Sequence, residues 1–441
     1  MAHAALRSVT AARVALDAGE TTARGLVEAA IDALETDEYG VLQHPMYESA
    51  LDAAADSDER IAAGEARPLE GVPFGVKDII AIAGVPTTYG SPRYQDFVPN
   101  VTATVIRRLV DAGAIPVAKL RTYEFAAGPN DLTVNPHNPT RMSGGSSSGS
   151  AAAVGGGLLP FAVGTDTGGS VRVPAAWCGA VGIKPTYGWV SRHGVAPLSW
   201  TLDHVGFLAG DPMDCLLLLA SVAGQDQLDP YSADNVSPPT KPLAEYRVGV
   251  PWGWFSAVSQ PDVVARLEEA AARLAAAGLE VVDVVLEGIE EMNVDIVKHV
   301  IVSVEAAAVH EGPIHTYGPN FGNVLAHGRD ILGVDYARAL RARPVIQGVV
   351  EDAFSHVDLM LTPGSPITAP ERGTQYLAVR ERKYKLGNLV ARCTSLFDIT
   401  GHPAITVPFG TDSDGMPVGV QLVGRLWDDL RTVEAASLLS V

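Results

Sequence analysis

Short apolar segments alternate with alanine-rich helical segments along this chain, and that alternation limits its possible folds more than any other feature. Residues 71–80 are β-branched and bounded by glycine and proline, which is typical of a buried strand. Residues 102–114 predict a helix that ends at glycine, and 115–120 predict the next strand. The same order returns at 150–166. These strand–helix–strand units predict an α/β fold with a mixed, mainly parallel central sheet.

The second half of the chain repeats the pattern after a polar, proline-rich stretch at 225–241, which predicts an exposed connection. That connection is too short to show two domains. Strands are expected at 246–251 and 279–286, with an amphipathic helix at 261–278 between them. Residues 288–353 are mostly helical in pattern, and we expect them to cover the edge of the sheet or a substrate cleft.

Charge and cysteine content exclude several classes of function. The net charge of the 441 residues is −19, which disfavours nucleic acids as partners. The three cysteines are far apart and indicate a reducing compartment. The most apolar run, at 215–224, is about half of the ~20 residues of a membrane helix. With no C-x-x-C or H-E-x-x-H motif, we expect a cytoplasmic protein that uses no metal, nucleic acid or membrane.

Five serines and three glycines fill residues 143–150, a composition that is typical of a flexible loop. The stretch is brief, however, and it runs directly into the helix-forming residues 151–154. A second glycine–serine turn follows the strand expected at 161–166. Glycines before a helix can direct several backbone N–H groups at one point, which makes an anion or oxyanion site. Two such turns favour a folded site over a linker.

Residues 145–149 also match G-x-S-x-G, the nucleophile elbow of α/β-hydrolases, with Ser147 at its centre. That elbow needs a strand immediately before it. The preceding residues 135–142 are rich in proline and asparagine, which is typical of a loop. An α/β-hydrolase-type esterase that uses Ser147 is therefore the weaker alternative.

Several segments together resemble the amidase signature family. They are MSGGSSSGSAAAV, GTDTGGSVRVPAAWCGAVGIKPTYG, the lysine strand GVPFGVKDI, and the C-terminal pair FDITGHPAITVPFG and MPVGVQLVG. The resemblance covers essentially the whole chain. It implies a single large α/β/α domain over 1–441, with the core motifs at 71–210. It also implies hydrolysis of an acyl carbon–nitrogen bond by a Ser–Ser–Lys triad that needs no metal or other cofactor.

The motifs of that family assign roles to residues of this chain. The nucleophile corresponds to Ser170 and the base to Lys77. The bridging serine, which a cis peptide holds after Gly145, corresponds to Ser146. The oxyanion hole corresponds to the backbone N–H groups of Thr167, Gly168, Gly169 and Ser170.

A lysine base makes chemical sense at this place in the sequence. A serine hydroxyl is a weak nucleophile until a neighbouring base takes its proton. A neutral lysine can be that base where burial disfavours its charged form. Lys77 has valine, phenylalanine and isoleucine around it in the sequence, which suits a dry position.

Other polar residues near the motifs are expected to have structural roles. Asp166 and Arg172 flank the nucleophile and would support its loop as an ion pair. Cys178 would be a small buried packing residue rather than a thiol nucleophile. The remaining serines of the first turn are expected to cap the helix that follows, namely Ser147, Ser148 and Ser150.

Members of the family differ in substrate. The glutaminase subunit of the tRNA-dependent amidotransferase places an aspartate near the substrate amino group, seven residues before a characteristic asparagine. This chain has Ala391 and Asp398 at those two positions. We therefore expect a stand-alone amidohydrolase, a monomer or homodimer, whose partners are water and a small neutral or aryl amide, or a carbamate (urethane). The glutaminase subunit is the alternative.

Overall fold

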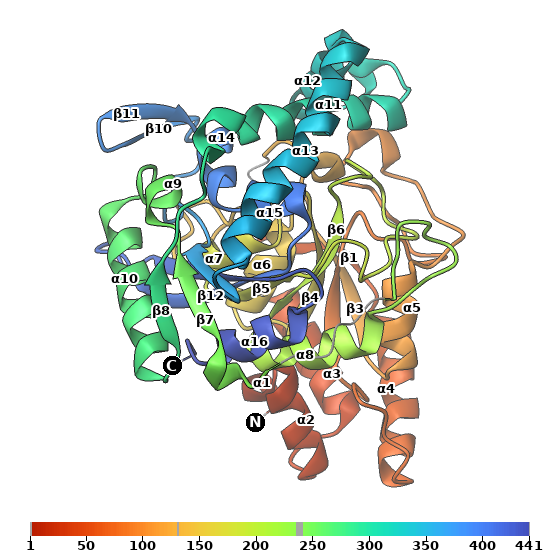
Figure 1. Ribbon diagram of the computed structural model, residues 1–441. Coiled ribbons are helices and arrows are strands. Elements are labelled where there is room, and N and C mark those ends of the chain that lie inside the picture. The colour runs from red at the N-terminus through yellow and green to blue at the C-terminus, as the bar shows by residue number, and fades with distance from the viewer. Residues whose placement is uncertain (1, 130–131, 235–240, 441) are drawn as a thin grey trace.

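The computed structural model describes residues 2–129, 132–234 and 241–440. Within these ranges an 11-stranded mixed sheet crosses the molecule, and helices pack on both of its faces (Figure 1). The predicted α/β fold is confirmed. Of the connection expected at 225–241, residues 235–240 lie outside the described part of the chain. One sheet built from both halves of the chain supports the proposal of a single domain.

In spatial order, the strands of this sheet are β1 (Leu42–Pro45), β3 (Ile115–Leu120), β2 (Pro73–Lys77), β4 (Phe161–Asp166), β6 (His204–Ala209), β5 (Val181–Lys184), β12 (Ala404–Thr411), β13 (Pro417–Gly424), β9 (Leu359–Pro363), β7 (Arg247–Val250) and β8 (Glu280–Asp283). A separate hairpin is formed by β10 (Tyr376–Val379) and β11 (Arg382–Lys385).

The α-helices are α1 (Ala2–Ala5), α2 (Val9–Asp17), α3 (Ala23–Glu35), α4 (Tyr47–Ala62), α5 (Thr104–Asp111), α6 (Ser148–Gly155), α7 (Arg172–Cys178), α8 (Pro212–Val222), α9 (Trp252–Ser256), α10 (Pro261–Ala276), α11 (Val294–Val309), α12 (Pro319–Asp330), α13 (Gly333–Phe354), α14 (Leu386–Val390), α15 (Ser395–Thr400) and α16 (Asp429–Ser437). Short 3-10 helices are η1 (Pro92–Tyr94), η2 (Glu124–Ala126), η3 (Leu243–Glu245), η4 (Ile289–Met292), η5 (Ile314–Thr316) and η6 (Ala391–Cys393).

Strand direction differs between the ends and the centre of the sheet. Parallel pairs join β3, β2 and β4 at one end and β9, β7 and β8 at the other. From β4 through β6, β5, β12 and β13 to β9, each strand is antiparallel to the next. The edge strand β1 is antiparallel to β3. The predicted parallel pairing is therefore found in the two outer groups of strands, β3–β2–β4 and β9–β7–β8, and not in the centre or at the β1 edge.

The connections explain this difference. Parallel neighbours need a crossover, and α5 joins β2 to β3 while α10 joins β7 to β8. Antiparallel neighbours can be joined by a tight turn, and β12 returns into β13 through a turn with Gly415 at φ +79°. Between β5 and β6 the chain returns at 185–203 without a helix. Because such returns carry no helical periodicity, strand direction in the centre was not apparent from the sequence.

The regions expected to be strands and helices mostly match the structure. The predicted strands at 115–120 and 161–166 coincide with β3 and β4, and the helix expected at 261–278 is α10. The region expected to be helical at 288–353 contains α11, α12 and α13, and α11 packs against both of the others in the upper part of the view in Figure 1. Of these helices, α11 and α12 form one wall of the candidate site.

Helix α7 packs unusually close to the centre of the sheet, against β5, β12 and β13. Glycines on the strands make that approach possible. A Cβ atom at Gly419 of β13 would lie 2.5 Å from the Cβ of Ala176, and one at Gly182 of β5 would lie 2.6 Å from the Cβ of Ala175. Because α7 begins just after the glycine–serine turn, this packing also sets the height of that turn above the sheet.

We therefore predict that Gly419→Ala lowers the free energy of unfolding by about 1–3 kcal/mol, because the added methyl overpacks the helix–sheet interface. Gly348→Ala is the matched control. Gly348 is exposed within α13 and a Cβ there meets nothing within 4 Å, so this variant should gain about 0.5–1 kcal/mol. Urea denaturation of both variants measures the difference, and equal stabilities would contradict the packing argument.

Candidate active site

Lys77 ends β2 with its side chain fully buried. Its Nζ atom donates to Ser146 Oγ at 2.7 Å and to Thr165 Oγ1 at 2.7 Å. Burial lowers the pKa of Lys77 to about 7, against the opposing effect of the Asp166 and Asp203 carboxylates. A group with this pKa is partly neutral at physiological pH, so it can accept a proton.

The aspartate next to Lys77 in the sequence belongs to a different interaction. Asp78 pairs with Lys119 at 3.0 Å, and both side chains are buried. Lys119 Nζ also donates to the backbone oxygen of Ile80 and to Thr87 Oγ1. Consecutive residues of a strand point to opposite faces of the sheet, so the Lys77 side chain points away from Asp78 and toward Ser146.

The glycine–serine stretch at 143–150 is an ordered turn, and the flexible-loop alternative is wrong. The Gly145–Ser146 peptide bond is cis, as the family resemblance implied. The backbone oxygen of Ser146 accepts from Tyr123 N at 3.2 Å and from Thr122 Oγ1 at 3.1 Å. The Tyr123 ring also packs so closely on Gly145 that a Cβ there would overlap it. These contacts fix Ser146 next to Lys77.

The other serines of this stretch do not cap α6, which corrects the capping prediction. Ser147 Oγ donates to the Thr165 backbone oxygen at 3.2 Å, and Ser150 Oγ donates to that of Val163 at 3.2 Å. Ser148 Oγ donates to the Arg121 backbone oxygen at 3.5 Å. Helix α6 lies against strand β4, so these hydroxyls reach backbone oxygens beside them before they reach the helix N-terminus. Ser147 is fully buried, which argues against it as an esterase nucleophile.

The second glycine–serine turn links the end of β4 to the start of α7. Asp166 Oδ1 accepts from Gly169 N at 2.6 Å, and Gly169 has φ +119°, which glycine alone adopts easily. Thr167 Oγ1 donates to Asp203 at 2.6 Å, and the backbone oxygen of Gly168 accepts from Thr394 Oγ1 at 2.8 Å. The turn is therefore held at three successive residues.

This geometry changes the expected oxyanion hole. The N–H of Gly169 already donates to Asp166, so it is engaged inside the protein. The expectation that it stabilises an oxyanion is therefore corrected. In the described part of the chain the N–H groups of Thr167, Gly168 and Ser170 have no acceptor, so these three are the available donors.

Arg172 is the polar centre behind this turn, and its side chain is fully buried. It pairs with Asp166 at 3.0 Å and with Asp398 at 2.8 Å. Its other terminal nitrogen, Nη1, donates to the backbone oxygen of Thr394 at 3.1 Å and to Gln421 Oε1 at 2.9 Å. Burial opposes its charge, but the two aspartates raise the pKa of Arg172, which therefore stays cationic. The expected support of the loop by this pair agrees with the geometry.

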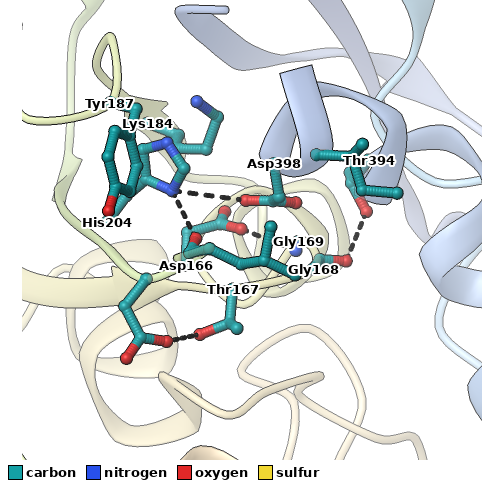
Figure 2. A network of polar contacts seen from close by, with 12 residues as sticks. Asp166, Thr167, Gly168, Gly169, Lys184, Tyr187, His204, Thr394 and Asp398 are labelled. Atoms are coloured by element: carbon teal, nitrogen blue, oxygen red, sulfur yellow. Dashed lines mark hydrogen bonds and ion pairs between the residues drawn. The ribbon is translucent and has the colours of Figure 1, made fainter. Parts of the chain in front are cut away.

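Figure 2 shows the surroundings of Asp166 and Asp398 from close by, with the His204 ring beside the two aspartates and Lys184 near that ring. His204 Nδ1 lies 3.6 Å from Asp398 Oδ1. Burial, followed by the charge of Lys184, lowers the pKa of His204 well below its usual value, so the imidazole is neutral. Thr394 reaches from the other side to the Gly168 backbone, as the dashed line marks.

The two serines and the turn face a common cavity of about 260 Å³. Its lining includes Ser146, Ser170 and the glycines of the second turn. A larger cavity of about 750 Å³ adjoins it and shares Tyr123, Gly145 and Val173 with it. Helices α11 and α12, from the region at 288–353 that was expected to cover a cleft, complete the walls together with α14, which lies outside that region. A small molecule has room to bind with its carbonyl group near Ser170.

Three residues with a place in this site were not identified from the sequence. Thr165 contacts Lys77, Thr394 contacts the second turn, and Lys298 of α11 lines the cavity. Only Lys298 had a visible signal, because it is a lone lysine within the apolar helical run at 294–309.

Cys178 is fully buried at the end of α7, and burial raises the pKa of its thiol. This environment agrees with the packing role expected for it. Among the described residues, no three His, Cys, Asp or Glu side chains come together in a way that could hold a metal ion. The helices of the described ranges are all too short or too polar to span a membrane.

Known proteins are similar to this chain over nearly its whole length. It is 36% identical over 469 aligned positions to a glutamyl-tRNA(Gln) amidotransferase subunit from Chloroflexus aggregans, in an alignment that covers 96% of this chain and 93% of the relative. A structure from a vestigial protein complex related to an s-triazine catabolic enzyme is 31% identical with a TM-score of 0.91, covering 98% of both chains. The 6-aminohexanoate cyclic dimer hydrolase bound to its substrate is 27% identical with a TM-score of 0.86, covering 98% of this chain and 96% of its own. The pattern of the family described as Amidase matches residues 25–433, and with the site described above it shows that this chain belongs to the amidase family.

Proposed function

We propose that this protein hydrolyses small amides through an acyl-enzyme on Ser170. The observation that carries the proposal is the hydrogen bond of a buried, partly neutral lysine to Ser146 in a cavity that Ser170 also lines. Such a lysine can take a serine proton through an intervening hydroxyl. Carbamates are related substrates, because their carbonyl group presents the same geometry to the nucleophile.

The proposed reaction uses these groups in turn. Ser170 Oγ bonds to the substrate carbonyl carbon while its proton passes to Ser146, and the proton of Ser146 passes to Lys77. The carbonyl oxygen becomes negative and accepts from the free N–H groups of the second turn. When the carbon–nitrogen bond breaks, Lys77 returns the proton through Ser146 to the leaving nitrogen. Water then repeats the sequence on the acyl-enzyme and releases the acid.

Arg172 and Asp166 act as positioning residues in this proposal. Asp166 holds the N–H of Gly169 and that of Val171 at 3.0 Å, which orients the turn toward the cavity. Arg172 keeps Asp166 ionised by pairing with it. Neither side chain lines the cavity, so neither is proposed to contact the substrate.

The glutaminase subunit is the second candidate, because an amidotransferase subunit is among the relatives, at 36% identity to this chain. The α-amino group of glutamine would need a carboxylate in the cavity wall. Ala391 occupies the wall at the position where the resemblance places the aspartate of glutaminase subunits. We therefore favour an amide without an amino group near Ala391. Glutamine belongs in the same activity screen as anilides, primary amides and carbamates.

The role of Ser170 can be tested directly. Ser170→Ala should remove amide hydrolysis while the melting temperature stays within a few degrees of the wild type, since the hydroxyl is only partly buried. A serine-reactive phosphonate should label wild-type protein at Ser170, as mass spectrometry of peptides would show. Labelling at Ser147 would contradict the proposal and favour an elbow-type esterase.

The pH dependence should report the protonation of Lys77. Because protonated Lys77 cannot accept a proton, kcat/KM should fall about tenfold per pH unit below about pH 7 and level off above it. Lys77→Arg cannot deprotonate and should be as inactive as Lys77→Met. Asp203→Asn removes a charge that raises the pKa of Lys77, so the midpoint of the pH profile of kcat/KM should move to lower pH in this variant. A midpoint that does not move in this variant, or an active Lys77→Arg, would contradict a lysine base.

The positioning role of Arg172 predicts a large effect on stability. Arg172→Met leaves two buried aspartates without their cation, which should cost roughly 3–5 kcal/mol in the free energy of unfolding. Arg338→Met is the matched control, because Arg338 pairs with Asp335 on the exposed face of α13 and should cost at most about 1 kcal/mol. Guanidinium denaturation compares the two. Similar losses would mean that the buried network contributes no more than a surface pair.

A further inference from the structure

The candidate cavities have a charge that differs from that of the protein as a whole. The chain carries a net charge of −19. Yet the two adjoining cavities are lined by Lys298, Lys385 and two histidines, His299 and His327. Among the described residues that line them, none is aspartate or glutamate. Burial lowers the pKa of His299, so the two lysines supply the positive charge of the lining. Lysines without facing carboxylates favour a ligand of the opposite charge.

Of the two lysines that line the cavities, Lys298 is the one that lies next to the second glycine–serine turn. It projects from α11 toward the second glycine–serine turn, and a Cβ at Gly168 would lie 3.5 Å from its Nζ. Gly168 precedes Ser170 by two residues. Since consecutive Cα atoms are about 3.8 Å apart, these two backbones are separated by no more than about 8 Å. A group bound by Lys298 would therefore lie only a few bonds from the carbonyl group that Ser170 attacks.

The ammonium group of Lys298 lacks a protein partner in the described ranges, where it takes part in no hydrogen bond and no ion pair. The carboxylates close enough to influence it belong to Asp295 and Asp398. Each of those is paired elsewhere, Asp295 with Arg392 at 3.2 Å and Asp398 with Arg172 at 2.8 Å. Burial also lowers the pKa of Lys298, which a bound anion would oppose.

A second polar group of α11 lies in the same cavity. Ser303 is buried, and its Oγ has no hydrogen-bond partner among the described residues. It lines the smaller cavity together with Lys298. Buried polar atoms are nearly always paired, so this hydroxyl is a second polar group of α11 at the cavity that lacks a partner in the described chain.

We infer that Lys298 is a specificity residue, and that the substrate is a small amide with a carboxylate within a few bonds of its scissile carbonyl. The inference rests on the proposed amide hydrolysis and narrows its substrate class. It also revises the sequence-based expectation of a neutral substrate, because a neutral amide would offer the ammonium no group of opposite charge. The α-ammonium of glutamine, placed near Ala391 in the same wall, would instead be repelled.

Pairs of substrates that match in shape and differ in charge provide the test. Malonamate and isovaleramide are one such pair, and succinamate and isocaproamide are another. Ammonia release gives kcat/KM for each compound. Wild-type protein should favour the acid amide of each pair, and Lys298→Met should reduce that preference by roughly 10- to 100-fold. Lys298→Arg keeps the charge and should retain most of the preference.

Controls separate this inference from the proposed function. Lys241 lies outside both cavities and pairs with Asp358. Lys241→Met should therefore not alter the preference for acid amides over neutral amides. Equal losses on acid and neutral amides in Lys298→Met would overturn the inference, as would a wild-type preference for neutral amides. If no amide is hydrolysed, the proposed function fails. Calorimetric binding of succinamate to Ser170→Ala, with and without Lys298→Met, then still decides the role of the lysine: equal binding overturns it.

Discussion

The buried ion pairs of Arg172 are the interaction on which the site depends. One guanidinium joins the end of β4 through Asp166, α15 through Asp398 and β13 through Gln421. Those elements are far apart in the sequence and meet only where α7 crosses the centre of the sheet. The Asp166 carboxylate that Arg172 keeps ionised also holds the turn that carries Ser170. The orientation of the turn that carries Ser170, the proposed nucleophile, therefore depends on the ion pairs of Arg172 behind it.

A low lysine pKa is not by itself a sign of catalysis in this protein. Burial lowers the pKa of Lys184 to about 7, the same value that it gives to Lys77. Lys184 donates to the backbone oxygens of His402 at 2.7 Å and Pro185 at 3.1 Å, and it lines neither of the two candidate cavities. Lys77 instead contacts the hydroxyl of Ser146, which does line a cavity. A lysine proposed as a base therefore differs from a structural lysine in its hydrogen-bond partner and in whether that partner lines a cavity that a ligand can enter.

Features that depend on neighbouring residues could be predicted from the sequence, and features that depend on distant ones could not. Strands β3 and β4 and the cis peptide before Ser146 follow from local composition or motif. The antiparallel centre of the sheet does not, because strand partners are chosen by connections that leave no periodic pattern. Likewise, serine side chains at the start of α6 look like caps in sequence, but β4 lies close enough to take their hydrogen bonds. The N–H of Gly169 could not be excluded as an oxyanion donor without the position of Asp166.

The different origins of the two cavity walls explain why the sequence did not identify Lys298. The groups proposed for bond cleavage come from residues 77–170. They lie at the end of β2 and in the two glycine–serine turns that precede α6 and follow β4. The opposite wall of the cavity comes from α11, α12 and α14, which reach it only through tertiary packing. A lysine in an amphipathic helix is most often a solvated residue, and only the packing of α11 over the second turn makes Lys298 a neighbour of Gly168. Substitutions on α11 are therefore expected to alter the proposed substrate preference without disturbing the Arg172 network, because the two share no hydrogen bond or ion pair in the described chain.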